Sequence, residues 1–255
     1  MKLISSNIRF ANLNDGCHDW PHRRALLTKL LLNYEADLIG TQEGFPPQLH
    51  DLENKLTGFK LIDSHRTYLD DRMYPCIFIN PDKIQIQSSG DIWLSKTPYI
   101  AGSFSFESAY PRLATWIKAK NINEGYEFIF IVTHLDHVLS STREEQIKVL
   151  ITELKKINAE NLPLILAGDF NESPKENVRK IITEEIPELI DPWFFLKKEE
   201  EASHHHFHLP IVNASRIDWF LVDKKFRAQE IFLDKTHENN IFPSDHYLLK
   251  LNILK

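Results

Sequence analysis

Short strand-like runs that end in a polar residue recur along the chain. These largely apolar runs cover residues 2–7, 37–43, 128–134 and 164–169. The polar residues at their ends are Asn7, Glu43, His134 and Asp169. Strand side chains alternate between two faces, and neighbouring strands form sheets. The pattern therefore predicts a sheet fold in which these four side chains converge at the strand ends.

The clearest of these runs leads into Asp169 and Asn171. The two residues are two positions apart, so they are expected to project from the same side at the carboxyl end of the strand. An ionisable acid at the end of a buried strand is costly unless a metal, a hydrogen-bond donor or a substrate stabilises it. This end of the strand is therefore a candidate for chemistry.

Two further polar groups lie near the end of the chain. Asp218 is placed at the start of a strand-like run over 216–222, and Asp245 and His246 precede another run over 248–253. A sheet fold is the arrangement that can bring residues so far apart in the sequence to the edge that carries Asp169.

Two stretches have helical spacing. Pro21 suits the first turn of one helix, and a capping box of Ser141 and Glu144 predicts the start of another. Their apolar stripes are Leu27, Leu30, Leu31 and Tyr34 in the first helix and Ile147, Leu150, Ile151 and Leu154 in the second. Additional strands are expected over residues 76–79, 84–86 and 115–118. Strands and helices alternate without a strict βαβ repeat, which indicates an α/β chain.

Six short motifs occur in the order in which the endonuclease/exonuclease/phosphatase superfamily carries them. They are Asn7, Gln42-Glu43, Thr133-His134-Leu135, Gly168-Asp169-Phe170-Asn171, Ile217-Asp218 and Ser244-Asp245-His246. Each motif is too short to carry weight alone, but six in order are specific. The chain thus resembles this superfamily over residues 1–255, and within it a bacterial branch of metal-dependent hydrolases. Further matches to that branch are Trp20, Arg23, Arg112, Thr115, Trp116 and Arg143.

The resemblance implies a fold as well as a chemistry. It implies a DNase I-like α/β fold, a four-layer αββα sandwich of two packed β-sheets flanked by helices, as a single domain over residues 1–255. The chain has 255 residues, of which 42% are hydrophobic, so one domain of this size can bury a substantial core.

The resemblance also implies metal-assisted phosphoryl transfer. Mg²⁺ or Mn²⁺ is the expected cofactor, because these hard cations prefer oxygen ligands. Glu43 is the leading metal ligand, with Asn7 and Asp245 in or near the same shell. Asp169 is the expected general base for the attacking water, and Asn171 is expected to hold a phosphoryl oxygen.

Histidines complete the expected machinery. His246 is expected to donate to the phosphate as a cation that Asp218 orients, and His134 is expected to offer a second donor. Relatives commonly carry a Glu ahead of the strand over 76–79 that can steady this histidine. Residues 72–74 of this chain hold no acid at that place, which leaves the orientation of His134 open.

Several of these residues also fit plainer structural roles. Asn7 suits a turn at a strand end, and Glu43 suits a helix cap or a solvated position. Asp218 and His246 suit a purely structural ion pair. Trp93, Trp116 and Trp219 are expected in the core.

The arginines and the histidine-rich stretch are open to more than one interpretation. Arg66 and Arg112 suit phosphate contacts and ordinary ion pairs equally well. His205 is a candidate substrate contact in a loop beside the site. Consecutive histidines over 203–208 seldom form a closed metal shell, so a metal site in this stretch is not favoured.

Charge and composition limit the partners and the location. The net charge of −6 does not favour a long polyanion, so a phosphorylated small molecule or a short oligonucleotide is the expected substrate of a monomer. Cys17 and Cys76 form no disulfide framework, and there is no apolar run long enough for a signal peptide or a membrane span. A cytoplasmic location is expected, although a processed amino terminus would look the same.

Three hypotheses for function remain at this point. The first is a metal-dependent hydrolase that cleaves a phosphodiester or phosphomonoester by in-line attack of a water activated by Asp169. The second is a nuclease acting on DNA or RNA, which requires a basic groove and aromatic platforms beside Asn7 and Asn171. The third is a catalytically silent phosphate-binding module, against which the complete set of acids and histidines argues.

Overall fold

The computed structural model describes residues 1–208 and 215–255. Within these residues, twelve strands form two six-stranded sheets. The first sheet has the order β11-β12-β1-β2-β4-β3, and the second has the order β5-β6-β7-β8-β10-β9. The strands of the first sheet are β1 (Lys2–Asn7), β2 (Leu38–Gly44), β3 (Lys60–Leu61), β4 (Tyr74–Ile79), β11 (Arg227–Asp234) and β12 (Leu248–Leu254). Those of the second are β5 (Ile84–Trp93), β6 (Leu113–Asn121), β7 (Glu127–His134), β8 (Leu164–Asp169), β9 (Leu189–Ile190) and β10 (Asp218–Asp223).

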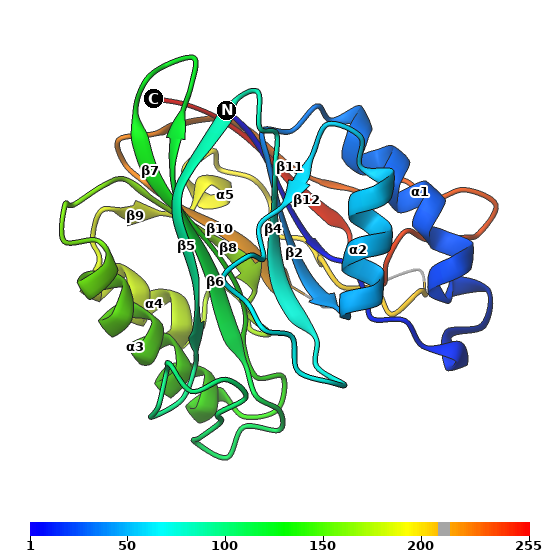
Figure 1. The fold of residues 1–255 in the computed structure, drawn as a ribbon, viewed down its shortest axis with the longest axis horizontal. Helices are drawn as coiled ribbons and strands as arrows, with labels where there is room; N and C mark the ends of the chain where they lie inside the picture. The colour runs from blue at the N-terminus through cyan, green and yellow to red at the C-terminus, as the bar shows by residue number, and fades with distance from the viewer. Residues whose placement is uncertain (209–214) are drawn as a thin grey trace.

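Helices cover the outer face of each sheet (Figure 1). α1 (Trp20–Asn33) and α2 (Pro46–Lys55) lie on the first sheet, whereas α3 (Ser140–Ile157) and α4 (Asn177–Glu185) lie on the second. A 3₁₀ helix (Leu13–His18) and the short α5 (Pro192–Phe195) complete the elements. The four layers confirm the αββα sandwich expected from the sequence.

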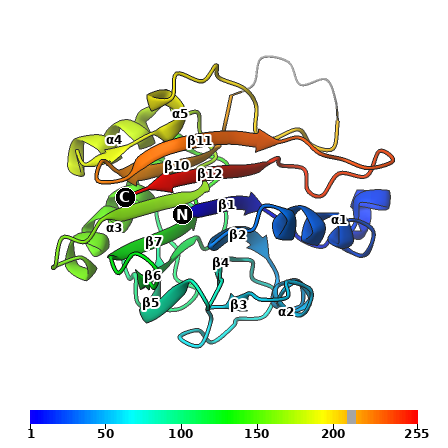
Figure 2. The same ribbon diagram turned by 90° about the horizontal axis from the view of Figure 1, so that it is seen from above.

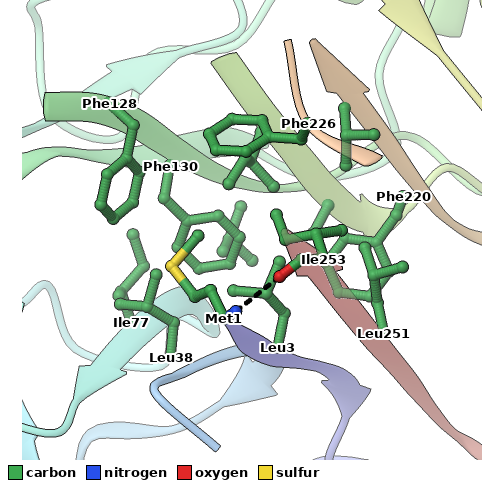
Figure 3. Close-up of a cluster of buried hydrophobic side chains, with 14 of the residues drawn as sticks. Met1, Leu3, Leu38, Ile77, Phe128, Phe130, Phe220, Phe226, Leu251 and Ile253 are labelled. Atoms are coloured by element: carbon green, nitrogen blue, oxygen red, sulfur yellow. Dashed lines mark hydrogen bonds between the residues drawn. The ribbon is translucent and has the colours of Figure 1, made fainter. Parts of the chain in front are cut away.

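The main core fills the space between the two sheets. Inward-facing side chains such as Leu3, Leu38 and Phe130 are fully buried there (Figure 3). Gly40 on β2 allows the sheets to approach closely, since an added Cβ would lie 2.5 Å from Cγ2 of Val132 on β7. The buried apolar area gives the sandwich its stability and fixes the relative position of the two sheets.

The two chain termini lie close together (Figure 1, Figure 2). The amino group of Met1 donates a hydrogen bond to the carbonyl of Ile253, at 2.6 Å (Figure 3). β1 starts at this end of the sandwich and runs away from it (Figure 1). The catalytic candidates at the other ends of the strands are therefore remote from both termini.

The strand ends meet as the alternation pattern predicted. β1 runs parallel to β2, and β7 runs parallel to β8, so the carboxyl ends of each pair lie at one edge. β10 is antiparallel to β8 and begins at this edge, where Asp218 lies directly opposite Asp169. The fold therefore joins residues from five strands at one place.

The helix boundaries follow the sequence only in part. Pro21 is in the first turn of α1 as expected. The predicted capping box of Ser141 and Glu144 is wrong, because α3 begins at Ser140 with no side-chain cap. The carboxylate of Asp136 instead accepts hydrogen bonds from the backbone of residues 138 and 139, at 2.8 and 3.0 Å. Asp136 thus accepts hydrogen bonds from the backbone N–H groups just before the helix, and it stabilises the short turn between β7 and α3.

The remaining sequence expectations concern tryptophans, cysteines and membrane spans. Trp93 and Trp219 are buried core residues as expected, whereas Trp116 is half-buried. Cys17 and Cys76 are both free. In the described part of the chain, none of the helices combines the length and the apolar character needed to cross a bilayer.

Candidate active site

A pocket of about 640 Å³ opens where the strand ends of the two sheets meet. Acids, histidines and arginines from both sheets line it together with a few aromatic rings. The predicted site residues in its lining are Glu43, Arg112, His134, Asp169, Asn171, Asp245 and His246.

Asp169 lies at the centre of this arrangement and is almost fully buried. Its Oδ1 accepts a hydrogen bond from the backbone of Asn171 (2.9 Å), and its Oδ2 accepts one from Nδ2 of Asn7 (3.0 Å). Burial, reinforced by the charge of Asp218, raises the pKa of Asp169 to about 6, although His246 and the hydrogen bonds oppose the shift. A carboxylate with this pKa can accept a proton near neutral pH.

Gly168 explains how Asp169 comes so close to β7. A Cβ at Gly168 would lie 2.1 Å from the carbonyl oxygen of Thr133, a separation that no side chain tolerates. Only glycine allows this approach of β8 to β7. The result places Oδ2 of Asp169 3.5 Å from Nε2 of His134.

Asp218 and His246 form a buried pair beside Asp169. Nδ1 of His246 lies 2.8 Å from Oδ2 of Asp218, which also accepts a hydrogen bond from the hydroxyl of Ser203 (2.6 Å). Burial alone would lower the pKa of His246, but the charge and hydrogen bond of Asp218, with Asp169 and Asp245, raise it to about 10. His246 is therefore a cation at neutral pH, with its Nε2 3.8 Å from Oδ2 of Asp169.

Glu43 reaches the pocket because β2 is irregular at its end. The pairing of β2 with β4 shifts register between Thr41 and Gly44, and Glu43 adopts a left-handed backbone with φ 65°. Such irregularities re-aim a side chain. Nδ2 of Asn7 donates to Oε1 of Glu43 at 3.0 Å, so Asn7 bridges Glu43 and Asp169.

Candidate metal ligands among the described residues form groups that overlap, since Asp169 and His246 also share a third group with Asp218. One group brings ligand atoms of Glu43, His134 and Asp169 within 4.8 Å of one another, and another does the same for Asp245 with His204 and His246. The sequence expectation put Asp245 in or near the shell of Glu43. Asp245 lines the same pocket as Glu43, and its carboxylate also lies beside His204 and His246. His204, His246 and Arg9 together overcome burial and lower its pKa.

Arg112 settles the orientation of His134 that the sequence left open. Its Nη1 lies 3.1 Å from Nδ1 of His134, and its Nη2 lies 3.3 Å from Nδ1 of His137. An arginine can only donate, so Nδ1 of His134 accepts and the ring proton is on Nε2. Burial and the charge of Arg112 hold the pKa of His134 well below its usual range. His134 is therefore a neutral donor that faces Asp169.

Arg66 is not part of the pocket, which corrects the expectation of a phosphate contact. Its side chain is only 2% exposed, and it makes two hydrogen bonds of 2.7 Å to the carboxylate of Asp91. It also donates to the hydroxyl of Thr115 (2.6 Å) and to the carbonyl of Pro75 (3.2 Å). With its donors engaged by the protein, Arg66 ties a loop to three strands.

His205 is likewise turned away from the pocket, which corrects its assignment as a substrate contact. It is 3% exposed and packs against the rings of Phe242 and Tyr247, at 4.7 and 4.5 Å between centroids. Burial lowers its pKa to about 3. Its neighbours His204 and His206 line the pocket in its place.

Sequence reasoning also missed residues that loops carry to the pocket. These are Arg9, Phe10, Phe45, Arg72, Tyr110, His137, His204 and His206. They lie in irregular segments or at strand ends, where no hydrophobic periodicity indicates which way a side chain points. The histidine-rich stretch was the one available signal, and its reach into the pocket depends on which alternate residues face inward.

Comparison with known proteins agrees with the six motifs. A family model described as the Endonuclease/Exonuclease/phosphatase family matches residues 4–246. Mannosyl-6-phosphatase from Bacteroides thetaiotaomicron is 26% identical, with a TM-score of 0.91 and 100% of each chain covered. An endonuclease/exonuclease/phosphatase family protein from the same organism is 27% identical, with a TM-score of 0.86, 99% of this chain covered and 97% of that chain.

A relative among animal proteins is much longer. Nocturnin from Drosophila melanogaster is 27% identical in an alignment of 206 residues that covers 70% of this chain and 30% of nocturnin. The chain thus spans less than a third of that relative. The family model covers nearly the whole chain, from residue 4 to residue 246. The chain therefore belongs to the endonuclease/exonuclease/phosphatase family, whose members are phosphoester hydrolases.

Proposed function

We propose that the protein is a Mg²⁺- or Mn²⁺-dependent hydrolase of a small phosphorylated molecule. The observation that carries this proposal is the meeting of Asp169, Glu43 and His246 in the lining of one pocket, with His246 held from behind by the buried Asp218. Asp169, with a pKa of about 6, and His246, with a pKa of about 10, lie 3.8 Å apart there. The general base and the cationic hydrogen-bond donor are therefore two adjacent groups.

Asp169 is the proposed general base. Its Oδ2 is the oxygen nearest to both histidines, and its pKa keeps it largely ionised at neutral pH. It would orient a water for in-line attack on phosphorus and accept a proton from it. Asn171 donates one amide hydrogen to the carbonyl of Leu135 (3.1 Å), which leaves its other amide hydrogen for a phosphoryl oxygen.

Histidines and an arginine would stabilise the charge on the phosphoryl group. His246 donates as a cation, His134 donates as a neutral imidazole, and Arg112 adds a buried positive charge beside His134. Donors fixed in advance around a developing negative charge are among the strongest contributions to catalysis. Each of these donors is held by a protein partner before a substrate arrives.

The acids of the pocket fit a hard divalent cation. Glu43 would hold the ion with Asn7 and Asp245 nearby, and no thiolate lies in the pocket lining of the described chain. Bound Mg²⁺ or Mn²⁺ supplies charge neutralisation on the phosphate and stabilisation of the leaving oxygen. Phe10 donates its backbone N–H to Oε2 of Glu43 at 3.2 Å, so the chain itself fixes the direction of this carboxylate.

The size of the pocket favours a small substrate. A volume of about 640 Å³ falls within the range of small-molecule sites, and the net charge of −6 does not favour a long polyanion. The similar Bacteroides protein is named a mannosyl-6-phosphatase. We therefore favour a phosphomonoester such as a sugar phosphate, acted on by a cytoplasmic monomer.

A short oligonucleotide is the second candidate substrate. Tyr110 is 52% exposed at the pocket, and its ring is nearly parallel to that of His137, with the centroids 5.9 Å apart. Exposed aromatic rings beside a phosphate site suit a nucleobase. They suit the apolar face of a sugar equally, so the substrate panel must contain both.

The test is phosphate release from a panel of esters with Mg²⁺ or Mn²⁺. The panel comprises hexose phosphates, nucleoside monophosphates, a generic phosphodiester and a short oligonucleotide, with Asp169→Asn as the background for each. We expect the largest rate above this background for a phosphomonoester. Cleavage of the oligonucleotide alone would establish a nuclease, and binding of inorganic phosphate without turnover of any ester would establish a silent module.

A further inference from the structure

The segment that carries His204 is paired with the segment that carries His246. The two residues form an antiparallel bridge, flanked by backbone hydrogen bonds of 2.8 Å from His205 to Asp245 and from Tyr247 to Ser203. Residues directly opposite each other in such a pair have adjacent side chains. The rings of His204 and His246 accordingly stack, with centroids 4.2 Å apart and planes 20° apart.

This pairing completes a set of three metal-binding groups. Nε2 of His204 lies 3.5 Å from Oδ2 of Asp245, and the ligand atoms of His204, Asp245 and His246 lie within 4.8 Å of one another. Bonds of about 2.0–2.2 Å in a tetrahedral zinc site separate neighbouring ligand atoms by roughly 3.3–3.6 Å. An ion lies in the plane of each imidazole that binds it, so the ring of His204, now stacked on that of His246, would have to rotate for the three groups to share one ion.

The environment of His246 also suits metal binding. Histidines that bind a metal usually donate their other ring N–H to a carboxylate, which fixes the ring. Nδ1 of His246 makes this contact with Asp218 at 2.8 Å, and Ser203 holds Asp218 in turn. Nε2 of His246 is thereby directed at the pocket. The positive charge of Arg9 opposes the binding of a cation here, since its Nη1 is 3.7 Å from Oδ2 of Asp245.

We propose that His204, Asp245 and His246 form a site for a borderline divalent transition metal, with Zn²⁺ as the best match. Two imidazoles and one carboxylate make a set that Zn²⁺ prefers, and three protein ligands leave a position for water or phosphate. Mg²⁺ prefers oxygen ligands throughout, so it belongs on the Glu43 side of Asp169. His204 lies outside the six family motifs and comes from the histidine-rich stretch.

Occupancy of the site has a consequence that rests on the proposed function. Zn²⁺ on Nε2 of His246 replaces the proton with which this ring would contact the phosphate, and the proton passes to solvent. Zn²⁺ should therefore slow the Mg²⁺-dependent reaction. Excess Mg²⁺ should relieve this inhibition poorly, because the two imidazoles of the site bind Zn²⁺ and do not suit Mg²⁺.

The binding test uses Zn²⁺ alone with the full chain. Isothermal titration calorimetry measures its affinity, and the visible absorption of Co²⁺ in its place reports a low coordination number. We expect His204→Ala to weaken Zn²⁺ binding at least about tenfold, and Asp218→Asn to weaken it about 10–100-fold by freeing the ring of His246. Thermal melts in EDTA establish that each variant is folded.

His206→Ala is the matched control. His206 lines the same pocket, and its ring lies 3.7 Å from that of His204, but it is outside the group of three ligands. Its removal should leave Zn²⁺ affinity within about twofold of the wild type. Equal losses for His204→Ala and His206→Ala would assign the metal to the histidine-rich stretch as a whole and overturn the proposal. Wild-type affinity in His204→Ala would overturn it as well.

The activity test is kept separate from binding. Each variant's rate with Mg²⁺ and added Zn²⁺ is divided by its own rate with Mg²⁺ alone, and His204→Ala should require at least about tenfold more Zn²⁺ for half-inhibition. Binding that depends on His204 in a protein that hydrolyses no ester would support the metal site and refute the proposed function. Inhibition that is unchanged in His204→Ala would refute the link between this site and catalysis.

Discussion

Nη1 of Arg112 lies 3.1 Å from Nδ1 of His134, and this contact gives the histidine a positively charged partner. An acid at this place would favour a protonated imidazole, whereas an arginine excludes a proton from Nδ1. Burial and the charge of Arg112 lower the pKa of His134 well below its usual range. His134 thus donates from Nε2 throughout the neutral range without titrating.

Arg112→Met should raise the pKa of His134 and lower kcat by about a hundredfold, the scale of losing a donor to a developing charge. The raised pKa follows because the variant removes a nearby positive charge and the group that keeps Nδ1 unprotonated. Imidazole ¹⁵N shifts measured against pH would report the change. Arg72→Met removes another arginine of the pocket lining and should leave the His134 signals unaltered. Identical titration of His134 in wild type and Arg112→Met would contradict the assigned tautomer.

Removal of divalent ions should abolish activity and leave the fold intact. The acids of the pocket need a cation to bind a phosphate, whereas the main core between the sheets is apolar. Activity after treatment with EDTA and after addition of Mg²⁺ or Mn²⁺ is the measurement, with circular dichroism as the control. Full activity after exhaustive chelation would mean that hydrolysis needs no divalent ion.

The strand ends were predictable because their signal is local. A run of apolar residues followed by Asp169 or His134 defines both the strand and its polar end, and the structure places these residues as expected. Arg66 was not predictable in this way. Its partner Asp91 is 25 residues away on β5, so only the folded sheet reveals that the guanidinium is fully engaged.

The histidine-rich stretch shows a second limit of sequence reasoning. Side chains in an extended segment alternate between faces, so a shift of one residue exchanges the buried and the pocket-facing set. Pairing of His204 with His246 decides this register, which buries His205 and turns His204 to the pocket. Nothing within residues 203–208 specifies that partner. The candidate Zn²⁺ site was therefore invisible before the fold was known.

Asp169→Asn should reduce kcat by about 10²–10⁴, the contribution typical of a general base. In the wild type, kcat/KM should rise with pH through about 6 as Asp169 loses its proton, and this rise should be absent from the residual activity of the variant. Wild-type rates in a folded Asp169→Asn protein would assign the activation of water to another group.

The same substitution should change stability little at pH 7. The pKa of Asp169 in the folded chain is about 6, above its unfolded value of about 3.9, so ionisation opposes folding increasingly as the pH rises through this interval. Asparagine removes that cost but loses a hydrogen bond, since both carboxylate oxygens accept one. The two effects roughly cancel. Thermal melts at pH 5 and pH 7 test this account. Relative to the wild type, the melting temperature of Asp169→Asn should be higher at pH 7 than at pH 5, because the ionisation cost that the variant avoids is larger at pH 7.

Arg66→Met should lower stability by about 3–5 kcal/mol, the scale for breaking a buried ion pair, because it leaves Asp91 without its main partner. Burial alone would raise the pKa of Asp91, but Arg66 and His65 lower it to about 2. The stabilisation is thus present above the unfolded pKa and is lost as pH falls towards 2. Urea unfolding measures the effect, and adding Asp91→Asn should recover part of it. An unchanged urea midpoint of Arg66→Met together with a raised KM would instead indicate that Arg66 contacts the substrate.

Asp218 and His246 should act as one unit rather than as two independent contributors. Among the catalytic candidates, Asp218 hydrogen-bonds to Nδ1 of His246 and otherwise acts only through its charge on Asp169. Its removal should therefore cost little once His246 is absent, while each single substitution should cost a large factor in kcat. A double-mutant cycle of Asp218→Asn and His246→Ala, scored on kcat/KM with thermal melts as the folding control, measures the coupling. Additive losses in folded variants would show that the two residues serve different steps, and the buried 2.8 Å contact would then be structural.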